Sequence, residues 1–175
     1  MKLDEAIKLI SGIEGINKPN QQWADLGCGE GLFTRALANL LGKDSIIHAV
    51  DINLRSLSSF PDLENQVMIK KHKFDFINQE IQFNGLDGVF MANSFHFVKN
   101  KSTFISKLKI HLNASHSLLI VEYDTDVSNS WVPYPISFES LEKFFINEGY
   151  QSLKKLHSMP SLYNRADIYS ALLRG

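Results

Sequence analysis

Three glycines that alternate with other residues, Gly27, Gly29 and Gly31, most constrain what this chain can fold into. The apolar run at 22–26 before them has the length of a short buried strand, and the segment after them repeats apolar residues along one helical stripe as far as Gly42. Residues without a Cβ allow a tight turn and close approach of a ligand, and a helix start presents free N–H groups. The segment therefore predicts a strand, a nucleotide-binding loop and a helix.

The spacing of these glycines distinguishes two kinds of nucleotide. A dinucleotide fingerprint has the form G-x-G-x-x-G, and its third glycine position holds Leu32 here. With an acidic residue two positions before the first glycine, the segment instead resembles motif I of the class I S-adenosylmethionine-dependent methyltransferases, an acidic residue followed by G-x-G-x-G. The resemblance implies S-adenosylmethionine as the cofactor, S-adenosylhomocysteine as the product, and cofactor contacts from five residues: Asp25, Gly27, Cys28, Gly29 and Gly31.

A second acidic residue lies where this family holds the ribose. The apolar run 45–51 ends in Asp51, at the distance from Gly31 that an intervening helix requires. A carboxylate can accept hydrogen bonds from both ribose hydroxyls, and its charge strengthens them. The resemblance implies this role for Asp51 and a cofactor contact from the next residue, Ile52. Without the glycine loop, a helix cap or turn residue would be the default interpretation of Asp51.

The third strand of the family is followed by a residue near the adenine amine and an apolar neighbour against the ring. Asp75 and Phe76 resemble this pair. Asp75 would accept a hydrogen bond from the amino group, and Phe76 would cover the ring. A phenylalanine after a strand is equally well explained as part of the hydrophobic core.

The fourth apolar run, 86–98, resembles the small-molecule branch of the family, of the type 11 or type 25 kind. An acidic residue, Asp87, opens it and a polar and aromatic turn, 93–97, follows the strand. Asn93 is expected near the amino group of the methionine moiety, with either its backbone carbonyl or its side chain making the contact. The turn lacks the Asn-Pro-Pro-Tyr type of sequence found in methylases of base amines and glutamine amides, which makes those substrates less favoured.

The remaining segments keep the order of this family. Apolar spacing predicts a helix through Phe104, Ile105, Leu108 and Leu112, a strand at 117–123, a helix from Ser137 to Gly149, and two closing strands. Together with an N-terminal helix, this predicts an α/β protein. The expected fold is a three-layer αβα sandwich around a seven-stranded, mostly parallel sheet with an antiparallel last strand, in one domain over 1–175.

Composition excludes several classes of protein. The chain has 175 residues, of which 44% are apolar, enough for the core of one domain, and it has no apolar run long enough to span a bilayer or act as a signal peptide. We therefore expect a cytoplasmic protein. A single cysteine excludes an internal disulfide, no cluster has metal-ligand spacing, and Cys28 fits as a small residue in a crowded loop. The formal charge of −1 disfavours a nucleic-acid partner, and the pattern is silent on oligomeric state.

The chemistry of methyl transfer requires little beyond alignment, because the sulfonium activates the methyl group. A general base is needed only where the acceptor loses a proton. His96 is the candidate for this base and for substrate contact, since it follows the fourth strand and histidine titrates near neutral pH. The alternative is a packed, hydrogen-bonded histidine without a catalytic role.

The loop at 124–136 is the candidate substrate wall. It contains Trp131 and Tyr134, whose rigid aromatic side chains would cover a small acceptor. A loop folded onto its own aromatics explains the same residues. Tyr163 and Arg165, before the last strand, are also placed at the border of the pocket.

The sequence thus predicts an S-adenosylmethionine-dependent methyltransferase acting on a small organic molecule. A non-catalytic S-adenosylmethionine-binding protein that acts through a partner remains an alternative, because methyl transfer has no obligatory catalytic residue. A small NAD(P)-dependent oxidoreductase is a further alternative, which Leu32 disfavours.

Overall fold

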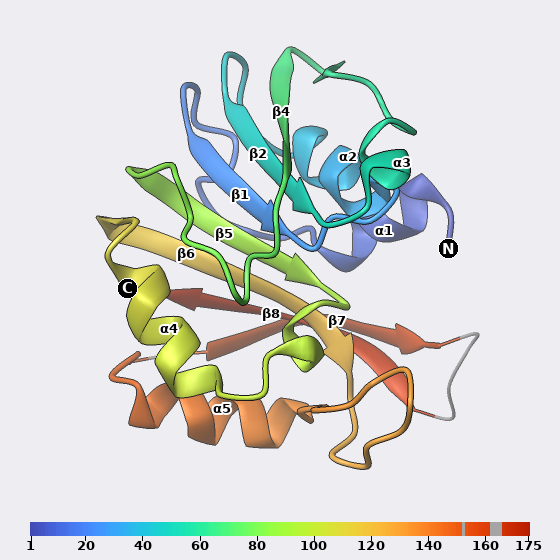
Figure 1. Ribbon diagram of the computed structural model, residues 1–175, viewed down its shortest axis with the longest axis vertical. Helices are drawn as coiled ribbons and strands as arrows, with labels where there is room; N and C mark the ends of the chain where they lie inside the picture. Colours follow the sequence, from blue (N-terminus) through green and yellow to red (C-terminus); the bar gives the residue numbers. More distant parts are fainter. Residues whose placement is uncertain (152, 162–165) are drawn as a thin grey trace.

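The backbone of the computed structural model, described over residues 1–151, 153–161 and 166–175, is built around one β-sheet (Figure 1). Within these ranges the sheet has eight strands, in the order β3-β4-β2-β1-β5-β6-β8-β7. The strands are β1 (Gln22–Leu26), β2 (Ile46–Asp51), β3 (Leu63–Glu64), β4 (Val67–Lys73), β5 (Leu86–Ala92), β6 (Leu112–Tyr123), β7 (Leu153–Pro160) and β8 (Asp167–Arg174). The helices are α1 (Leu3–Leu9), α2 (Leu32–Ala38), α3 (Leu54–Leu57), η1 (Phe95–Phe97), α4 (Lys101–Lys109) and α5 (Phe138–Asn147).

The direction of the strands confirms the predicted sheet. Strands β4, β2, β1, β5 and β6 run parallel, and β8 pairs antiparallel with both β6 and β7. The strand count differs from the predicted seven because β3 adds a two-residue edge strand. It pairs with β4 through a turn at Asn65 and Gln66, both with positive φ, as in a type I′ hairpin. A strand this short leaves no periodicity in the sequence.

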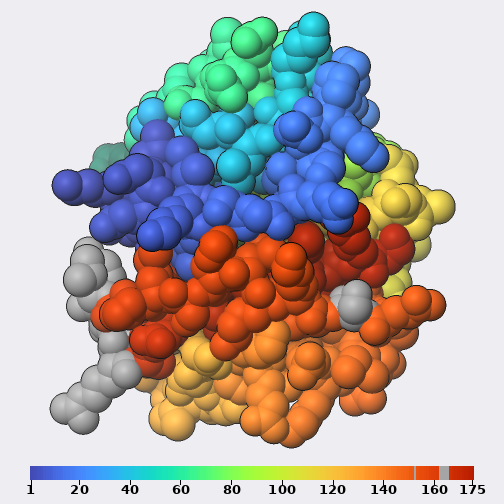
Figure 2. Space-filling model, turned by 180° about the vertical axis from the view of Figure 1, so that it is seen from behind, coloured from blue at the N-terminus to red at the C-terminus, as the bar shows by residue number. Residues whose placement is uncertain are grey.

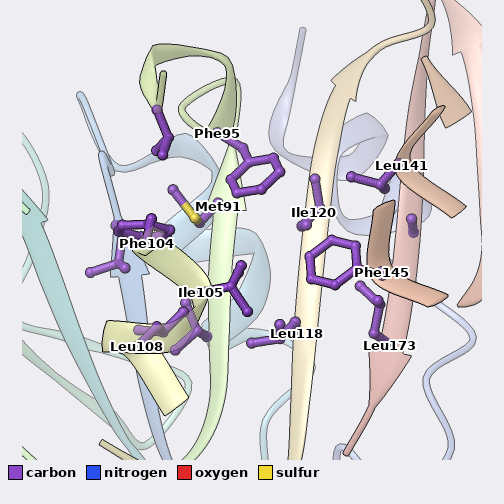
Figure 3. Packing of buried hydrophobic residues seen from close by; sticks show 14 of the residues in the cluster. Met91, Phe95, Phe104, Ile105, Leu108, Leu118, Ile120, Leu141, Phe145 and Leu173 are labelled. Carbon is purple, nitrogen blue, oxygen red and sulfur yellow. The ribbon is translucent and has the colours of Figure 1, made fainter. Parts of the chain in front are cut away.

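Helices cover both faces of the sheet, which gives the predicted three layers (Figure 1). The helices α1, α2 and α3 pack on one face, and α4 and α5 pack on the other. Figure 3 shows the second face, where side chains of α4 and α5 meet those of β5 and β6. Phe95 stacks on Phe145 there, with 6.1 Å between ring centroids.

Several predicted boundaries are correct and one is wrong. The strand at 22–26 and the cap of α5 are as predicted, since Ser137 Oγ accepts the Ser140 N–H at 3.2 Å. Leu112, expected to end a helix, instead begins β6 and pairs with Leu86, while α4 ends at Lys109. An apolar residue four positions after Leu108 continues a helical stripe equally well as it begins a buried strand, so spacing alone misplaced it.

The connection from β4 to β5 contains no helix: residues 74–85, all described, form turns and irregular chain. Phe83 covers the sheet here by stacking on His48, with 4.2 Å between ring centroids. His48 Nδ1 lies 3.0 Å from His72 Nε2 on β4. Burial, with the nearby His72 and Lys70, lowers the pKa of His48 to about 4, so this ring is neutral in the folded protein at neutral pH.

On the back of the molecule the N-terminal segment lies against the C-terminal hairpin (Figure 2). Ser170 Oγ on β8 donates to the Leu9 carbonyl at 2.5 Å, and the Arg174 guanidinium donates to the Glu14 carbonyl. None of the helices in the described ranges has both the length and the apolarity needed to traverse a lipid bilayer.

We predict that Phe145→Ala lowers the free energy of unfolding by about 3 to 5 kcal/mol, because it leaves a cavity beneath Phe95 in a fully buried cluster. Chemical denaturation measures this change. The neighbouring Ile146→Ala is the matched control: its side chain is 57% exposed, so the change should stay within about 0.5 kcal/mol. Equal losses in the two variants would contradict the packing described for α5.

Candidate active site

The carboxyl ends of the parallel strands meet at one edge of the sheet, and the glycine loop lies on this edge directly after β1. The N–H groups of Gly27 and Cys28 both donate to the Val50 carbonyl of β2, at 2.9 and 3.0 Å. The loop is therefore fixed over the junction between β1 and β2, a usual position for ligands in parallel sheets.

Two of the loop glycines are required by close contacts. A Cβ at Gly27 would lie 2.6 Å from Ser94 Cβ, and one at Gly31 would lie 2.3 Å from the Phe60 ring. Both residues also have positive φ, +82° and +78°. Gly29 also has a positive φ, +53°, but a Cβ there would meet nothing within 4 Å. Gly29 thus leaves the loop backbone open to a ligand on that side.

Asp25, at the end of β1, is completely buried and only half satisfied. Thr34 Oγ1 donates to its Oδ2 at 2.6 Å, whereas Oδ1 is buried without a hydrogen-bond partner among the described residues. Burial raises its pKa to about 7, and the charge of Asp51 adds to this, although the Thr34 hydroxyl opposes it. A buried acceptor without a donor indicates a place for a hydrogen-bonding ligand.

Asn93, after β5, also has a side-chain oxygen without a hydrogen-bond partner. Its Oδ1 is buried without a partner in the described part of the chain, and its backbone has a φ of +52°, a conformation that asparagine tolerates. Its N–H is already used, donating to the Val121 carbonyl at 2.8 Å. Unpartnered oxygens therefore occur at the ends of two neighbouring strands, which suits a ligand with several N–H donors.

Asp51 lies against the glycine loop, as predicted from its place at the end of β2. Its Oδ2 accepts the Gly29 N–H at 2.9 Å, and its Oδ1 accepts the Asn53 N–H at 2.8 Å. The following residue, Ile52, is 66% exposed at the same edge. The structure therefore brings the predicted ribose residue to the loop.

Asp75 and Phe76 lie farther along this edge. Asp75 caps a turn, since its Oδ1 accepts the N–H groups of Ile77 and Asn78 at 2.9 and 3.2 Å. Burial opposes ionisation, yet hydrogen bonds from Asn78 and Ile77 outweigh it and hold the pKa of Asp75 below its usual value. The Phe76 ring packs on Phe104 and lies 3.3 Å from where a Cβ on Gly27 would be, so it belongs both to the core and to the border of the loop.

Cys28 packs in a small apolar cluster with Leu57 and Phe60 beneath the loop. Burial first, and then the charges of Asp25 and Asp51, raise the pKa of its thiol well above the usual value. The neutral, buried thiol fits the expectation of a small residue in a crowded loop.

His96 lies on η1 and forms a buried pair with Glu122, near the end of β6. The two residues are 3% and 1% exposed. His96 Nδ1 lies 2.8 Å from Glu122 Oε2, and the His96 backbone N–H donates to Oε1 at 3.0 Å. Sequence reasoning missed Glu122, although a lone carboxylate in an apolar strand was a signal, because such a group requires a buried partner.

The loop between β6 and α5 is attached next to His96. The Tyr134 N–H donates to the His96 carbonyl at 3.0 Å, and Lys101 Nζ donates to the Tyr134 carbonyl at 2.8 Å. Trp131, on the same loop, is 83% exposed. The structure therefore brings Tyr134 to His96 but leaves Trp131 in solvent, while Tyr163 and Arg165 lie outside the described residues.

A cavity of about 650 Å³ adjoins the site between residues 76–81 and α4. Of the candidate residues, Phe76 alone lines it, and Phe97 closes it on the side of η1. No group of three or more potential metal ligands occurs in the described ranges.

Comparison with known families decides what kind of protein carries this site. Residues 24–115, more than half of the chain, match the family described as a methyltransferase domain. The chain belongs to this family. The predicted resemblance is thereby confirmed, and the oxidoreductase alternative is not supported. No curated protein sequence matches this methyltransferase.

Solved structures confirm the fold of the methyltransferase. An S-adenosylmethionine-dependent methyltransferase from Aquifex aeolicus is 14% identical, with a TM-score of 0.64 over 99% of this chain and 98% of that one. One from Mesorhizobium loti is 13% identical, with a TM-score of 0.70 over 99% and 100%. Magnesium protoporphyrin IX methyltransferase from Synechocystis PCC 6803, with bound S-adenosylmethionine, is 14% identical, with a TM-score of 0.66 over 97% and 77%.

We predict that Asp25→Asn changes how the stability of this methyltransferase depends on pH. The pKa of Asp25 is higher in the folded than in the unfolded protein, so its proton stabilises the fold below about pH 4 and this contribution is lost as the pH rises to about 7. Three pKa units correspond to roughly 4 kcal/mol. Denaturation at pH 4 to 8 should show a steeper decline in the wild type than in the variant. Parallel curves would contradict the burial argument; the exposed Asp4→Asn is the control.

Proposed function

We propose that this methyltransferase uses S-adenosylmethionine and transfers its methyl group to a small organic molecule, within one domain over residues 1–175. The observation that carries the proposal is the pair of buried, unpartnered oxygens, Asp25 Oδ1 and Asn93 Oδ1, at the ends of the neighbouring strands β1 and β5. An ammonium group offers three donors, and a buried carboxylate favours a cation over a neutral ligand. The amino group of the methionine moiety meets both requirements.

The other residues of the loop fit the remaining parts of this cofactor. Asp51, already a double acceptor at the loop, would accept the ribose hydroxyls, with Ile52 exposed beside it. The backbone of the loop, with Gly27, Cys28, Gly29 and Gly31, would lie along the methionine side. Asp75 and Phe76 would hold the adenine, since Phe76 already borders Gly27.

The cofactor supplies a methyl group activated by a sulfonium charge. The chain then needs to hold the acceptor in line with it, and such alignment contributes up to roughly 7 to 11 kcal/mol in well-oriented cases. His96 would take a proton from the acceptor where one must leave, a function worth about 10²- to 10⁴-fold in rate. Tyr134, attached to His96, and Trp131, exposed on the same loop, would form the wall against the acceptor.

The sequence and one similar structure support a small acceptor. The turn 93–97 has no Asn-Pro-Pro-Tyr sequence, and the formal charge of −1 provides no electrostatic attraction for nucleic acid. One of the similar structures, the Synechocystis enzyme, is a magnesium protoporphyrin IX methyltransferase by name, so this fold accommodates small-molecule acceptors.

Calorimetry with S-adenosylhomocysteine tests the cofactor. We predict that the wild type binds it, and that Asp51→Ala weakens binding by roughly 1 to 3 kcal/mol, about 5- to 150-fold, through the loss of charge-assisted hydrogen bonds. Asp62→Ala, which removes a carboxylate that is 81% exposed, should leave the affinity unchanged. Binding of NAD in place of S-adenosylhomocysteine would overturn the proposal, and an unaltered Asp51→Ala affinity would remove Asp51 from the ribose site.

A further inference from the structure

We propose that Glu122 is a positioning residue that holds His96 as a general base, and that the atom methylated is therefore the oxygen of a hydroxyl group on the acceptor. This inference rests on the proposed function. It starts from the buried pair that neither the family motif nor the glycine loop explains.

Both oxygens of the Glu122 carboxylate contact His96. Glu122 Oε1 accepts the backbone N–H of His96 at 3.0 Å and lies 3.1 Å from the ring Nδ1, and Glu122 Oε2 lies closer to Nδ1, at 2.8 Å. Within the described residues, the hydrogen-bond partners of these oxygens all belong to His96. An ionised carboxylate can only accept, so Nδ1 carries the hydrogen and Nε2 of the neutral ring has a free lone pair.

The second ring nitrogen is the one left for an acceptor. Nε2 of His96 forms no hydrogen bond with the described residues, whereas Nδ1 is held by Glu122. His96 also follows Asn93 by three residues, and the intervening Ser94 contacts the glycine loop. This places the base on the turn that borders the predicted methionine end.

The arrangement requires a carboxylate at position 122, because an amide there would favour the other tautomer of His96. Glutamine has one acceptor oxygen, whereas His96 presents two N–H donors on this side. The backbone N–H cannot move its hydrogen, so it would keep the oxygen at the Oε1 position. The amide NH₂ would then take the Oε2 position, which is the nearer of the two to Nδ1, at 2.8 Å against 3.1 Å. The ring would then have to accept at Nδ1 and carry its hydrogen on Nε2. Replacing the orienting carboxylate of the serine-protease triad by an amide lowers kcat about 10⁴-fold through the same tautomer change.

The reaction step balances around this pair. The acceptor oxygen attacks the methyl carbon, the new O–C bond forms, and the C–S bond breaks with its electron pair going to sulfur. The hydroxyl proton goes to Nε2 of His96, and the imidazolium that results is stabilised by the negative charge of Glu122. The proton then leaves to water. A thiolate or a neutral amine attacks without prior loss of a proton, so a buried histidine and carboxylate serve a hydroxyl acceptor best.

Nitrogen-15 NMR of the histidine side chains tests the positioning. At pH 8, with the His96 signals assigned by their loss in His96→Gln among the six histidines, we expect a protonated Nδ1 and an unprotonated Nε2 in the wild type. In Glu122→Gln we expect the reverse, and in Glu139→Gln, which removes a side-chain charge that is 77% exposed on α5, no change. A wild-type ring protonated at Nε2, or an unchanged ring in Glu122→Gln, would overturn the role of Glu122.

Methyl transfer to matched probes tests the acceptor class. We would compare phenol with thiophenol and aniline, and benzyl alcohol with benzyl mercaptan and benzylamine. We expect turnover of a hydroxyl probe, a kcat lower by about 10²- to 10⁴-fold in Glu122→Gln, and little change in KM. Turnover of thiol or amine probes alone, or of no hydroxyl probe, would overturn the hydroxyl assignment.

A third measurement distinguishes failure of the proposed function from failure of this inference. A thermal shift with S-adenosylhomocysteine reports whether each variant is folded and binds the cofactor. If the wild type shows no shift, the cofactor assignment fails while the NMR result still decides the role of Glu122. If the shift is present and the tautomer does not change, only the further inference fails.

Discussion

The contact between Ser94 and the glycine loop is the one on which the rest of the site depends. Ser94 Oγ donates to the Leu26 carbonyl at 2.6 Å, and its Cβ occupies the space that any side chain at position 27 would fill. The contact joins the ends of β1 and β5. Because Asn93 precedes Ser94 and His96 follows it, one close approach fixes the turn that carries both the proposed binding residue and the proposed base. Glycine at position 27 is therefore required for Ser94 to approach the loop this closely.

Local patterns in the sequence predicted most of the fold, because the strand before the loop, the helix after it and the cap at Ser137 are set by neighbouring residues. The failures are all non-local or very short. The pairing of β3 depends on a two-residue hairpin, and the fate of Leu112 depends on its partner in β5. Glu122 and His96 are separated by 26 positions and meet only because β5 and β6 are adjacent. Spacing along one segment does not contain that information.

The two buried carboxylates of the site have opposite hydrogen-bond states. Asp25 has one donor for two oxygens, and burial raises its pKa to about 7, so it is poised to gain from a cationic ligand. Glu122 has donors on both oxygens and is committed to His96. Sequence reasoning found the first because it belongs to a motif, and missed the second because its partner is defined by the fold. The proposed binding carboxylate and the proposed positioning carboxylate thus lie on different strands, β1 and β6.

The helix-free connection after β4 has a consequence for local unfolding. This connection covers β2 and β4 through the stack of Phe83 on His48 and the contact between His48 and His72. The other half of the same face is covered by two helices, α4 and α5. Opening of this edge lets His48 bind a proton that the closed state excludes, so acid favours the open form. Asp75 follows β4 directly. Hydrogen exchange should therefore be fast in the segment after β4, which carries the residues proposed for the adenine.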